Sequence, residues 1–377
     1  MYTRYHSFSD VASFRKEMLL DTKRDTRSGY EDILPAKIHV GAVYSNPPRD
    51  HASLTADKFV PVEKELVFDI DANDYDDIRF CVCKGTPAVC MICWGLMENA
   101  MHVIDSCLRL DFGFRHICWV FSGRRGVHGW VCDAKARTLP TKGRSAVASY
   151  IHVQKDVTRE NVRLAFDNIH PSLRRSHDKV LKPYFEGLVK EHELLMDEKA
   201  VEKVYEIVNA VKPGAAADIK KIWEEKDDVH TSASRWELLN SWARGEEKVK
   251  GSLLKHIPTA IIFHFSYPRL DIQVSMQWNH LLKAPMTVHP STGMICVPIT
   301  AQPISGRTGF NPTTCPRIHE VQQEIDHLVE TNGMEEEQAV RRSSLAPSLH
   351  LLEQFVAELA KDRRQQRLNH SDAKHTF

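Results

Sequence analysis

The stretch "ELVFDIDANDYDDIR" (residues 65–79) decides the fold, because it has the pattern of a buried strand that carries carboxylates. Apolar residues alternate in it with Asp69 and Asp71. Side chains two residues apart share one face of a strand, so one face is apolar and the other bears two neighbouring acids. Two carboxylates at this spacing repel each other unless a cation lies between them. Mg²⁺ or Mn²⁺ is the expected cation, since both prefer oxygen ligands.

An edge strand with its acidic face in water is the alternative, because isolated D-x-D pairs are common. A calcium-binding loop that starts at Asp71 is excluded: its sixth residue is Asp76 rather than Gly, and its twelfth is Val82 rather than Glu. A second segment of similar design favours the metal site. In "RLDIQV" (residues 269–274), which we predict to be a strand, Asp271 stands alone opposite three apolar residues. Three strand-borne carboxylates predict a two-metal site for nucleotidyl transfer.

Basic residues cluster in "WVFSGRRGVHGWV" (residues 119–131), which predicts a strand, a tight turn and a second strand. Gly123 and Gly126 permit the sharp turn, so that Arg124 and Arg125 project from it. Guanidinium groups match phosphate oxygens and therefore suit a nucleoside triphosphate. The alternative is a solvated basic hairpin.

A second segment, "NHLLKAPMTVHPSTG" (residues 279–293), adds two histidines and a lysine. The alternative for these is surface residues with one satisfied core histidine. The candidate phosphate-binding residues of the two segments are Ser122, Arg124, Arg125, His128, His280, Lys283 and His289. No Walker-type loop is present, which excludes a P-loop enzyme.

Four cysteines in "CVCKGTPAVCMICW" (residues 81–94) have the spacing C-x-C-x₆-C-x₂-C. Four thiolates at this spacing predict a tetrahedral, structural Zn²⁺ site, with buried free thiols or an iron–sulfur cluster as the alternatives. The predicted zinc ligands are Cys81, Cys83, Cys90 and Cys93. The isolated cysteines, predicted to serve in packing, are Cys107, Cys118, Cys132, Cys296 and Cys315.

The pattern of the sequence changes along the chain and predicts a mixed α/β (α+β) fold with a helical insertion. Short β-type runs, interrupted by a helix at roughly 91–109, give way to a lysine- and glutamate-rich helical region and then resume in "AIIFHFSYPRLDIQVS" and "MICVPIT". We expect an amphipathic helix near the end, with Leu349, Leu352, Val356 and Leu359 on one face. The predicted parts are 1–154 (first catalytic part), 155–255 (helical insertion), 256–317 (second catalytic part), 318–348 (acidic linker) and 349–377 (C-terminal helix and tail).

Composition limits the class of protein. With 50 basic and 50 acidic residues the formal net charge is zero, so a nucleic-acid partner would need a local basic surface. No apolar run approaches the roughly 18 residues that a membrane span needs, so no membrane partner is expected. Nine cysteines without a secretion signal point to a reducing compartment, the cytosol or the nucleus.

Taken together, the motifs resemble the catalytic small subunit of eukaryotic and archaeal DNA primases, the eukaryotic branch most closely. The resemblance rests on "ELVFDIDANDYDDIR", the cysteine cluster, "SGRRGVHGWVCD", "PRLDIQVS" and "NHLLKAPMTVHPSTG", which occur in the family's order. It extends to "SLAPSLHLLEQF" and so covers nearly the whole chain. It implies a prim-type α/β fold with mixed sheets flanked by helices and an all-α insertion.

The resemblance also implies roles for individual residues. Asp69, Asp71 and Asp271 would bind two catalytic Mg²⁺ or Mn²⁺ ions, and the four clustered cysteines would bind Zn²⁺. His280 and Leu281 would lie near the sugar, and Arg4 in "YTRYHSF" near the incoming nucleotide. The residues implied to contact the triphosphate are Ser122, Arg124, Arg125, His128, Lys283 and His289.

The sequence departs from the family pattern in three ways. The family has a segment ahead of "YTRYHSF" that carries an acidic residue near the nucleotide. Its absence here predicts either an incomplete gene model or a truncation that affects folding and activity. The cysteine spacing is looser than a near-adjacent first pair, and Gln273 stands where an Asn is usual.

The resemblance predicts a primase that polymerises ribonucleoside triphosphates onto an RNA primer on single-stranded DNA and releases pyrophosphate. Its implied partners are the large primase subunit and the DNA polymerase α complex, and its implied location is the nucleus. A repair-type primase-polymerase that prefers deoxynucleotides is one alternative. An inactive, zinc-stabilised scaffold subunit is the other.

Overall fold

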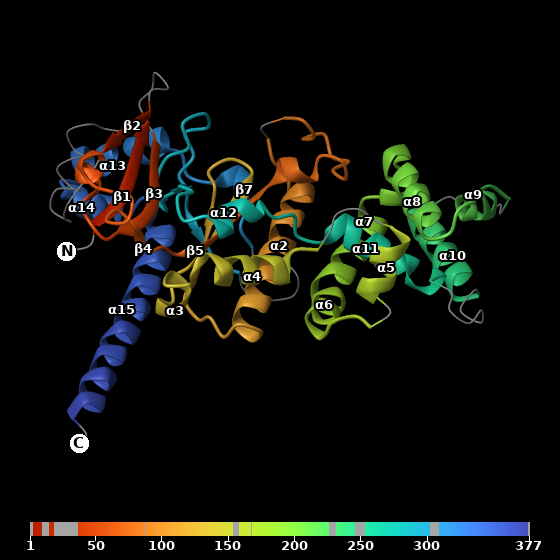
Figure 1. Ribbon diagram of the computed structural model, residues 1–377. Coiled ribbons are helices and arrows are strands. Elements are labelled where there is room, and N and C mark those ends of the chain that lie inside the picture. The colour runs from red at the N-terminus through yellow and green to blue at the C-terminus, as the bar shows by residue number, and fades with distance from the viewer. Residues whose placement is uncertain are drawn as a thin grey trace.

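The computed structural model describes residues 3–9, 15–18, 37–86, 88–153, 158–166, 168–225, 231–245, 253–301 and 309–375. The molecule is elongated, with a sheet at one end, a second sheet in the middle and a group of helices at the other end (Figure 1). Helix α15 (Ala346–His375) projects from the sheet end (Figure 1). Antiparallel sheets and separate helices make this an α+β fold, which confirms the predicted class.

The sheet at the end of the molecule joins the two halves of the chain. Its strands follow the order β2-β1-β3-β4, and β8 also pairs with β3. The pair His39 and Lys283 shows that the segment after the helical region returns to this sheet. The strands are β1 (Thr3–Ser9), β2 (Arg15–Met18), β3 (Lys37–Tyr44), β4 (Pro61–Glu63) and β8 (Leu282–Lys283).

The central sheet carries the acidic strand at its edge, in the order β5-β7-β6-β9. Along β5 every residue is buried except Asp69 and Asp71, which are half-buried, so the predicted alternation of apolar and acidic residues is confirmed. All the pairings are antiparallel. The strands are β5 (Leu66–Asp71), β6 (Ile117–Phe121), β7 (Gly126–Val131) and β9 (Pro298–Ile299).

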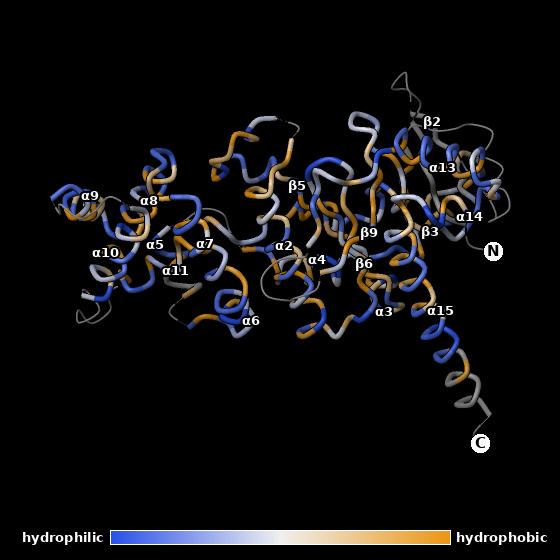
Figure 2. Tube along the Cα trace, turned by 180° about the vertical axis from the view of Figure 1, so that it is seen from behind, coloured by the Kyte–Doolittle hydropathy of each residue, from blue (hydrophilic) through white to orange (hydrophobic). Residues whose placement is uncertain are grey.

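The two faces of the central sheet contact different cores. Phe68 and Ile70 belong to the main core, together with Trp94 and Met97 of helix α2 (Met91–Leu110). Figure 2 shows apolar stretches along β5, β6 and β9. On the other face, Val67 joins a smaller core that also holds residues of β3 and β8. The acidic side chains therefore share a face with the junction between the two sheets.

The helices beyond the central sheet continue the main core. They lie on the far side of α2 and α4 (Figure 1). Helix α11 packs on α7 and α8, so the helical part extends to Ser266. The helices of this part are α5 (Arg159–Phe166), α6 (Pro171–Ser176), η3 (His177–Leu181), α7 (Lys182–Glu191), η4 (Leu194–Met196), α8 (Glu198–Val211), α9 (Ala215–Glu225), α10 (Ser232–Gly245), η6 (Leu254–His256) and α11 (Ile257–Ser266), whereas α3 (Ala134–Arg137) and α4 (Thr141–Ile151) lie beside the central sheet (Figure 1).

The strand predicted over 260–275 is wrong. The segment forms α11 and then α12 (Ile272–Met276), with Asp271 at the N-cap of α12. Most of α11 is buried, so its apolar run lacks the one-sided pattern that separates a helix from a strand. At Asp271 the carboxylate accepts a hydrogen bond from the Gln273 N–H at 3.1 Å, which is the usual role of an N-cap aspartate.

The acidic segment 318–348 is largely helical rather than a linker. Gly333, with φ of 60°, ends α13; Val321 of α13 belongs to the main core, and α14 packs against α13. The many acids are exposed side chains of packed helices. Helices α13 and α14 lie beside the N-terminal sheet in both views (Figures 1 and 2). The remaining elements are η1 (Pro48–Ser53), η2 (Ala72–Tyr75), η7 (Pro312–Thr314), α13 (Ile318–Asn332) and α14 (Glu336–Val340).

Helix α15 contacts the central sheet through a face that includes the predicted Leu352. Leu352 and Phe355 pack on the smaller core, whereas Val356 is 53% exposed. The carboxylate of Asp362 pairs with His116 Nε2 at 2.9 Å. Phe355 thus takes the place that the sequence pattern assigned to Val356.

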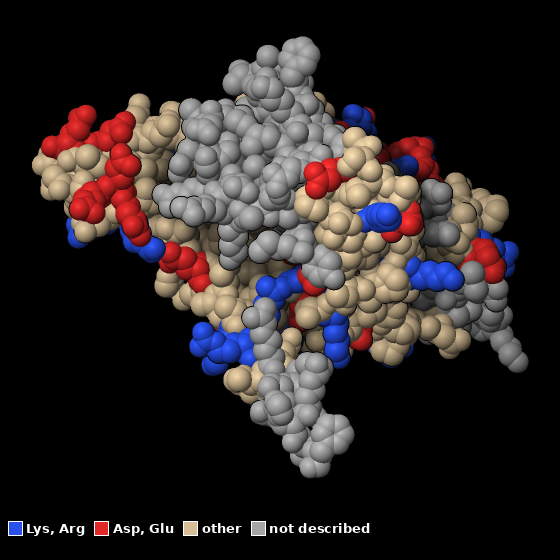
Figure 3. Space-filling view, turned by 60° about the vertical axis from the view of Figure 1, so that its left-hand side comes forward, with Lys and Arg blue, Asp and Glu red and all other residues tan. Residues whose placement is uncertain are grey.

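On the face shown in Figure 3 acidic side chains gather at the left end, and elsewhere acidic and basic side chains are interspersed. The described residues there form no continuous basic surface. No helix among the described residues has the length and apolar content needed to cross a membrane.

Arg144 on α4 fixes the start of the acidic strand. Its side chain is fully buried and stacks over Trp278 at 4.3 Å from the ring centroid. Burial lowers the pKa of Arg144 to about 10. Its guanidinium donates hydrogen bonds to the carbonyl oxygens of Lys64, Glu65, Arg137 and Leu139.

Arg144→Met is therefore expected to lower stability by about 3 kcal/mol, because the buried carbonyl oxygens lose their donor. Thermal unfolding should fall by roughly 6 °C or more. Lys142→Ala, on an exposed position of the same helix, is the control and should leave the transition nearly unchanged. Equal transitions for Arg144→Met and the wild type would show that Arg144 is not an anchor.

Candidate active site

Asp69 and Asp71 lie at the end of β5, where the neighbouring strand supplies a histidine. His128 of β7 is the register partner of Asp69, and Gly126 is the partner of Asp71. His128 Nε2 lies 3.6 Å from Asp69 Oδ1. The Asp69 side chain is 32% exposed, so it is accessible from solvent although its strand is buried. These contacts follow from the strand pairing and from the alternation along β5.

Asp271 reaches the same place from the other half of the chain. Its N–H donates to the carbonyl oxygen of Asp69 at 3.4 Å. Burial and then the negative charges of Asp71 and Asp271 raise the pKa of Asp69 to about 7, while the charge of Lys283 opposes the rise. The structure therefore brings the three predicted aspartates into one electrostatic cluster, although Asp271 stands on a helix N-cap rather than on a strand.

Arg125 is engaged with the acidic strand instead of projecting freely from the hairpin. Its Nε donates to Asp71 Oδ1 at 2.8 Å, and its Nη1 donates to the carbonyl oxygen of Thr86 at 3.2 Å. The same carboxylate oxygen accepts from the Asn73 N–H at 2.8 Å. The guanidinium thus neutralises Asp71 and links it to the cysteine loop.

The hairpin turn between β6 and β7 needs both of its glycines. The Ser122 N–H donates to the carbonyl oxygen of Gly126 at 2.9 Å, and the Gly126 N–H donates to Ser122 Oγ at 3.0 Å. Gly123 has φ of 80°, and a Cβ there would lie 2.7 Å from the Cβ of His289. A Cβ on Gly126 would lie 2.3 Å from the carbonyl oxygen of Ile70. Only glycine fits at these two positions without displacing the backbone.

Residues 282–294 donate hydrogen bonds to the carbonyl oxygens of the turn. Lys283 Nζ donates to the carbonyl oxygen of Ser122 at 2.8 Å, and Thr292 Oγ1 donates to that of Gly123 at 2.6 Å. The His289 N–H donates to the carbonyl oxygen of Met294 at 2.8 Å. Lys283 and His289 therefore lie at the turn, as the sequence predicts.

Two nitrogens near the turn lack partners. Arg124 Nε and His128 Nδ1 are buried and form no hydrogen bond with a described residue. Burial, followed by the charge of Lys283, lowers the pKa of His128 to about 3, so its imidazole is neutral near pH 7. A buried guanidinium N–H without a partner is costly, which makes Arg124 a candidate donor to an acceptor from outside the chain.

The remaining predicted residues lie in other parts of the structure. His280 and Leu281 are half-buried in the loop before β8, and burial together with Lys64 lowers the pKa of His280. The backbone of Arg4 pairs with Val43, and its side chain lies outside the described residues. Residues that the sequence reasoning missed include His39, the register partner of Lys283. Its position as the polar member of an apolar run in "KIHVGAVY" was the available signal.

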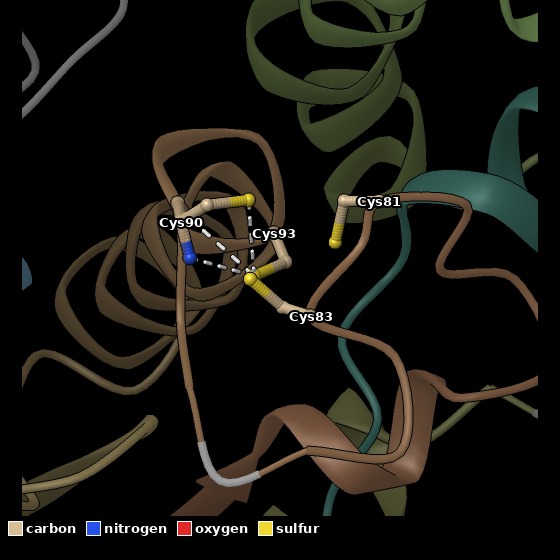
Figure 4. Close-up of side chains that lie close together, drawn as sticks. All are labelled: Cys81, Cys83, Cys90 and Cys93. Carbon is tan, nitrogen blue, oxygen red and sulfur yellow. Dashed lines mark hydrogen bonds between the residues drawn. The ribbon is translucent and has the colours of Figure 1, made fainter.

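The four cysteines form a compact cluster between a loop and the start of α2. Figure 4 shows Cys81 and Cys83 of the loop facing Cys90 and Cys93. Their sulfur atoms all lie within 4.8 Å of one another. Among the described residues no other set of Cys, His, Asp or Glu side chains converges as tightly. Four thiols at these distances fit a tetrahedral zinc ion.

The aspartate cluster is looser but suits a different metal. Asp71 Oδ1 and Asp271 Oδ1 both accept hydrogen bonds within the chain, which turns them partly aside. Burial and then repulsion from the neighbouring acids raise the pKa of Asp69, and a bound cation would relieve both effects. Carboxylate oxygens without thiol or imidazole ligands match Mg²⁺ or Mn²⁺.

Comparison with known proteins decides the family. A family model described as DNA primase small subunit matches residues 68–301. The DNA primase small subunit of Schizosaccharomyces pombe is 35% identical over 330 residues, 86% of this chain and 68% of the relative. Its counterpart in Drosophila melanogaster is 38% identical and covers 86% of this chain and 72% of the relative. The Saccharomyces cerevisiae subunit is 32% identical, and the match covers 96% of this chain and 82% of the relative.

The chain belongs to the DNA primase small-subunit family. It is therefore a nucleotidyltransferase, the catalytic RNA polymerase that makes primers, and the predicted family and activity are confirmed. Neither a repair-type primase-polymerase nor an inactive scaffold is favoured by the relatives. A primase catalytic subunit uses divalent metal ions, which agrees with the acidic cluster described above.

The raised pKa of Asp69 predicts a stability effect with a defined sign. Because the folded-state pKa of about 7 exceeds the ordinary value of 3.8, the folded chain binds the proton more tightly than the unfolded chain. Metal-free stability should then fall as the pH rises from about 4 to 7 and stay low above it. Asp69→Asn should raise the free energy of unfolding at pH 8 by about 1 to 2 kcal/mol, after allowance for solvent screening.

Thermal unfolding in the presence of a chelator at pH 5 and pH 8 measures this effect. The gain of Asp69→Asn over the wild type should be larger at pH 8. A variant less stable than the wild type at pH 8 would contradict the repulsive cluster.

Proposed function

We propose that Asp69, Asp71 and Asp271 hold two Mg²⁺ or Mn²⁺ ions for ribonucleotide transfer to the 3′-hydroxyl of an RNA primer. When bound, these ions supply Lewis-acid activation of the hydroxyl and neutralise the pyrophosphate that leaves. The observation that carries the proposal is the convergence of three acids from segments on either side of the helical region; burial and then the charges of Asp71 and Asp271 raise the pKa of Asp69 to about 7. The attacking group belongs to the primer, so no side chain needs to serve as a nucleophile.

The triphosphate of the incoming ribonucleotide would lie at the turn between β6 and β7. The partnerless Arg124 Nε and His128 Nδ1 support this position, because phosphate oxygens would accept their hydrogen bonds. His128 would donate as a neutral imidazole, since its pKa is about 3. Arg124 would therefore supply positive charge that His128 does not.

The other family-implied contacts are proposed on the same grounds. Lys283 already donates to the carbonyl oxygen of Ser122 and weakens the repulsion at Asp69, so it would serve both phosphate and carboxylate. Arg125 would reach phosphate only by sharing or leaving its bond to Asp71. The remaining proposed nucleotide contacts are Ser122 and His289 at the triphosphate, His280 and Leu281 near the sugar, and Arg4 near the incoming nucleotide.

We further propose that the four-cysteine cluster holds a structural Zn²⁺. The compact arrangement of its sulfur atoms, all within 4.8 Å of one another, supports this assignment. Four protein ligands leave no open position for substrate, so the ion would stabilise the loop that follows the acidic strand.

Partners and location are inferred from the eukaryotic relatives. The chain would pair with the large primase subunit, work with the DNA polymerase α complex on single-stranded DNA, and reside in the nucleus. The proposed division keeps a catalytic fold in two parts around a helical insertion and two C-terminal parts; because α11 packs with the inserted helices, the insertion would end near Ser266 and not at the expected residue 255.

Asp69→Ala and Asp271→Ala should each lower ATP incorporation on poly(dT) by more than about 100-fold, because each removes a metal ligand and its charge. Asp218→Ala, on an exposed position of α9, is the matched control and should retain activity. Wild-type activity in either site variant would overturn the metal assignment. Incorporation of dATP in preference to ATP by the wild type would instead point to the repair-type alternative.

Arg124→Gln should raise the KM for ATP by roughly 10-fold or more, because a charge-assisted bond to phosphate is lost. The kcat of the variant should change less than its KM, because the lost bond contributes to ATP binding in the ground state as well as in the transition state. Steady-state kinetics with primed poly(dT) measure both constants. Wild-type values of both KM and kcat would place the triphosphate away from Arg124.

A further inference from the structure

The residues that follow the acidic strand contact the segment that carries Asp271. Arg269 Nη1 donates to the carbonyl oxygen of Asp74 at 2.7 Å and also to the Asp77 carboxylate. The Arg269 side chain is 11% exposed and that of Asp77 is 30% exposed, so the pair is partly shielded from water. The helix η2, which begins directly after Asp71, is thereby joined to the returning chain.

The side chain of Tyr75 binds the backbone of the same arginine. The Arg269 N–H donates to the Tyr75 hydroxyl oxygen at 2.9 Å, and the guanidinium lies 5.3 Å from the centroid of the tyrosine ring. Tyr75 is fully buried, so its hydroxyl is a fixed acceptor. We refer to Tyr75, Asp77 and Arg269 as the latch.

The latch residues lie close in sequence to the proposed metal ligands. Arg269 precedes Asp271 by two residues, and Tyr75 follows Asp71 by four. After Asp271 the segment is held by Ser275, whose Oγ donates to the carbonyl oxygen of Val67 at 2.7 Å. Between these two anchors, Asp271 bonds to Gln273 and Val274 of its own helix, and its N–H makes a long 3.4 Å bond to the carbonyl oxygen of Asp69 on β5. The latch is therefore the anchor on the N-terminal side of Asp271.

We propose that Tyr75, Asp77 and Arg269 are positioning residues that set the distance between Asp271 and the acids of β5. The inference rests on the proposed metal-binding role of Asp271. Repulsion between ionised carboxylates pushes Asp271 away from Asp69, and the latch opposes that movement. The sequence "ANDYDDIR" thus serves the site through the segment that it holds, not as a set of metal ligands.

Asp76 provides a matched comparison within the same turn. Its carboxylate accepts from Arg79 Nε at 2.9 Å, so it pairs with a different arginine from Asp77. Replacing either aspartate by asparagine removes one negative charge at nearly the same place. A difference between the two variants therefore reports the latch rather than the loss of charge. Tyr75→Phe tests the latch with no change of charge at all.

The test measures Mn²⁺ binding to the full-length chain by the EPR signal of free Mn²⁺, without nucleotide. Asp77→Asn should weaken Mn²⁺ binding by about 3- to 10-fold relative to Asp76→Asn, the range expected for one lost hydrogen bond to a positioned ligand. Tyr75→Phe should weaken it by a similar factor relative to the wild type. In primer extension both latch variants should need more Mn²⁺ for half-maximal rate, with the KM for ATP nearly unchanged at saturating metal.

Asp271→Asn separates this inference from the proposed function. If the wild type and Asp271→Asn bind Mn²⁺ equally, the metal-binding role of Asp271 itself is wrong. If Asp271→Asn loses binding but Asp77→Asn matches Asp76→Asn and Tyr75→Phe matches the wild type, the metal site stands and the latch is refuted. A purely structural latch would lower the unfolding temperature of its variants while their Mn²⁺ affinity stayed constant, which also refutes it.

Discussion

Repulsion among carboxylates governs the arrangement of this site. Asp69 and Asp71 share one strand face, and Asp271 is brought beside them; burial of Asp69 and then the charges of Asp71 and Asp271 raise its pKa to about 7. The chain offsets part of this repulsion with Lys283, which lowers that pKa, and with Arg125, which pairs with Asp71. The rest remains as a preference for bound cations. A site that is unfavourable when empty and ionised is suited to holding the metal ions that a primase uses.

The fold supplies the rigid frame that this repulsion requires. The acidic strand is buried on its apolar face by α2 and fixed at its start by Arg144. The hairpin that carries the arginines is closed by Ser122 and supported by Lys283 from the returning chain. The helical region stands between the two halves in sequence but packs beyond α2 in space (Figure 1). The insertion therefore adds core without separating the acids.

Much of this site could be predicted because local patterns determine it. Alternation along β5 marked Asp69 and Asp71, and the glycines around Arg124 marked the turn. The context of Asp271 could not be predicted, because a buried apolar run such as α11 gives no one-sided pattern and an aspartate before "IQV" fits a helix cap as well as a strand. The partners of Arg125 and Arg269 depend on contacts between distant segments, which spacing does not report.

The most direct test of the account is anomalous X-ray scattering from crystals grown with Mn²⁺ and a non-hydrolysable ribonucleoside triphosphate. The account predicts manganese peaks ligated by the carboxylates of Asp69, Asp71 and Asp271, with the triphosphate against Arg124. It also predicts a separate zinc peak among the four cysteines. Manganese bound elsewhere, with these three carboxylates free of metal, would contradict it.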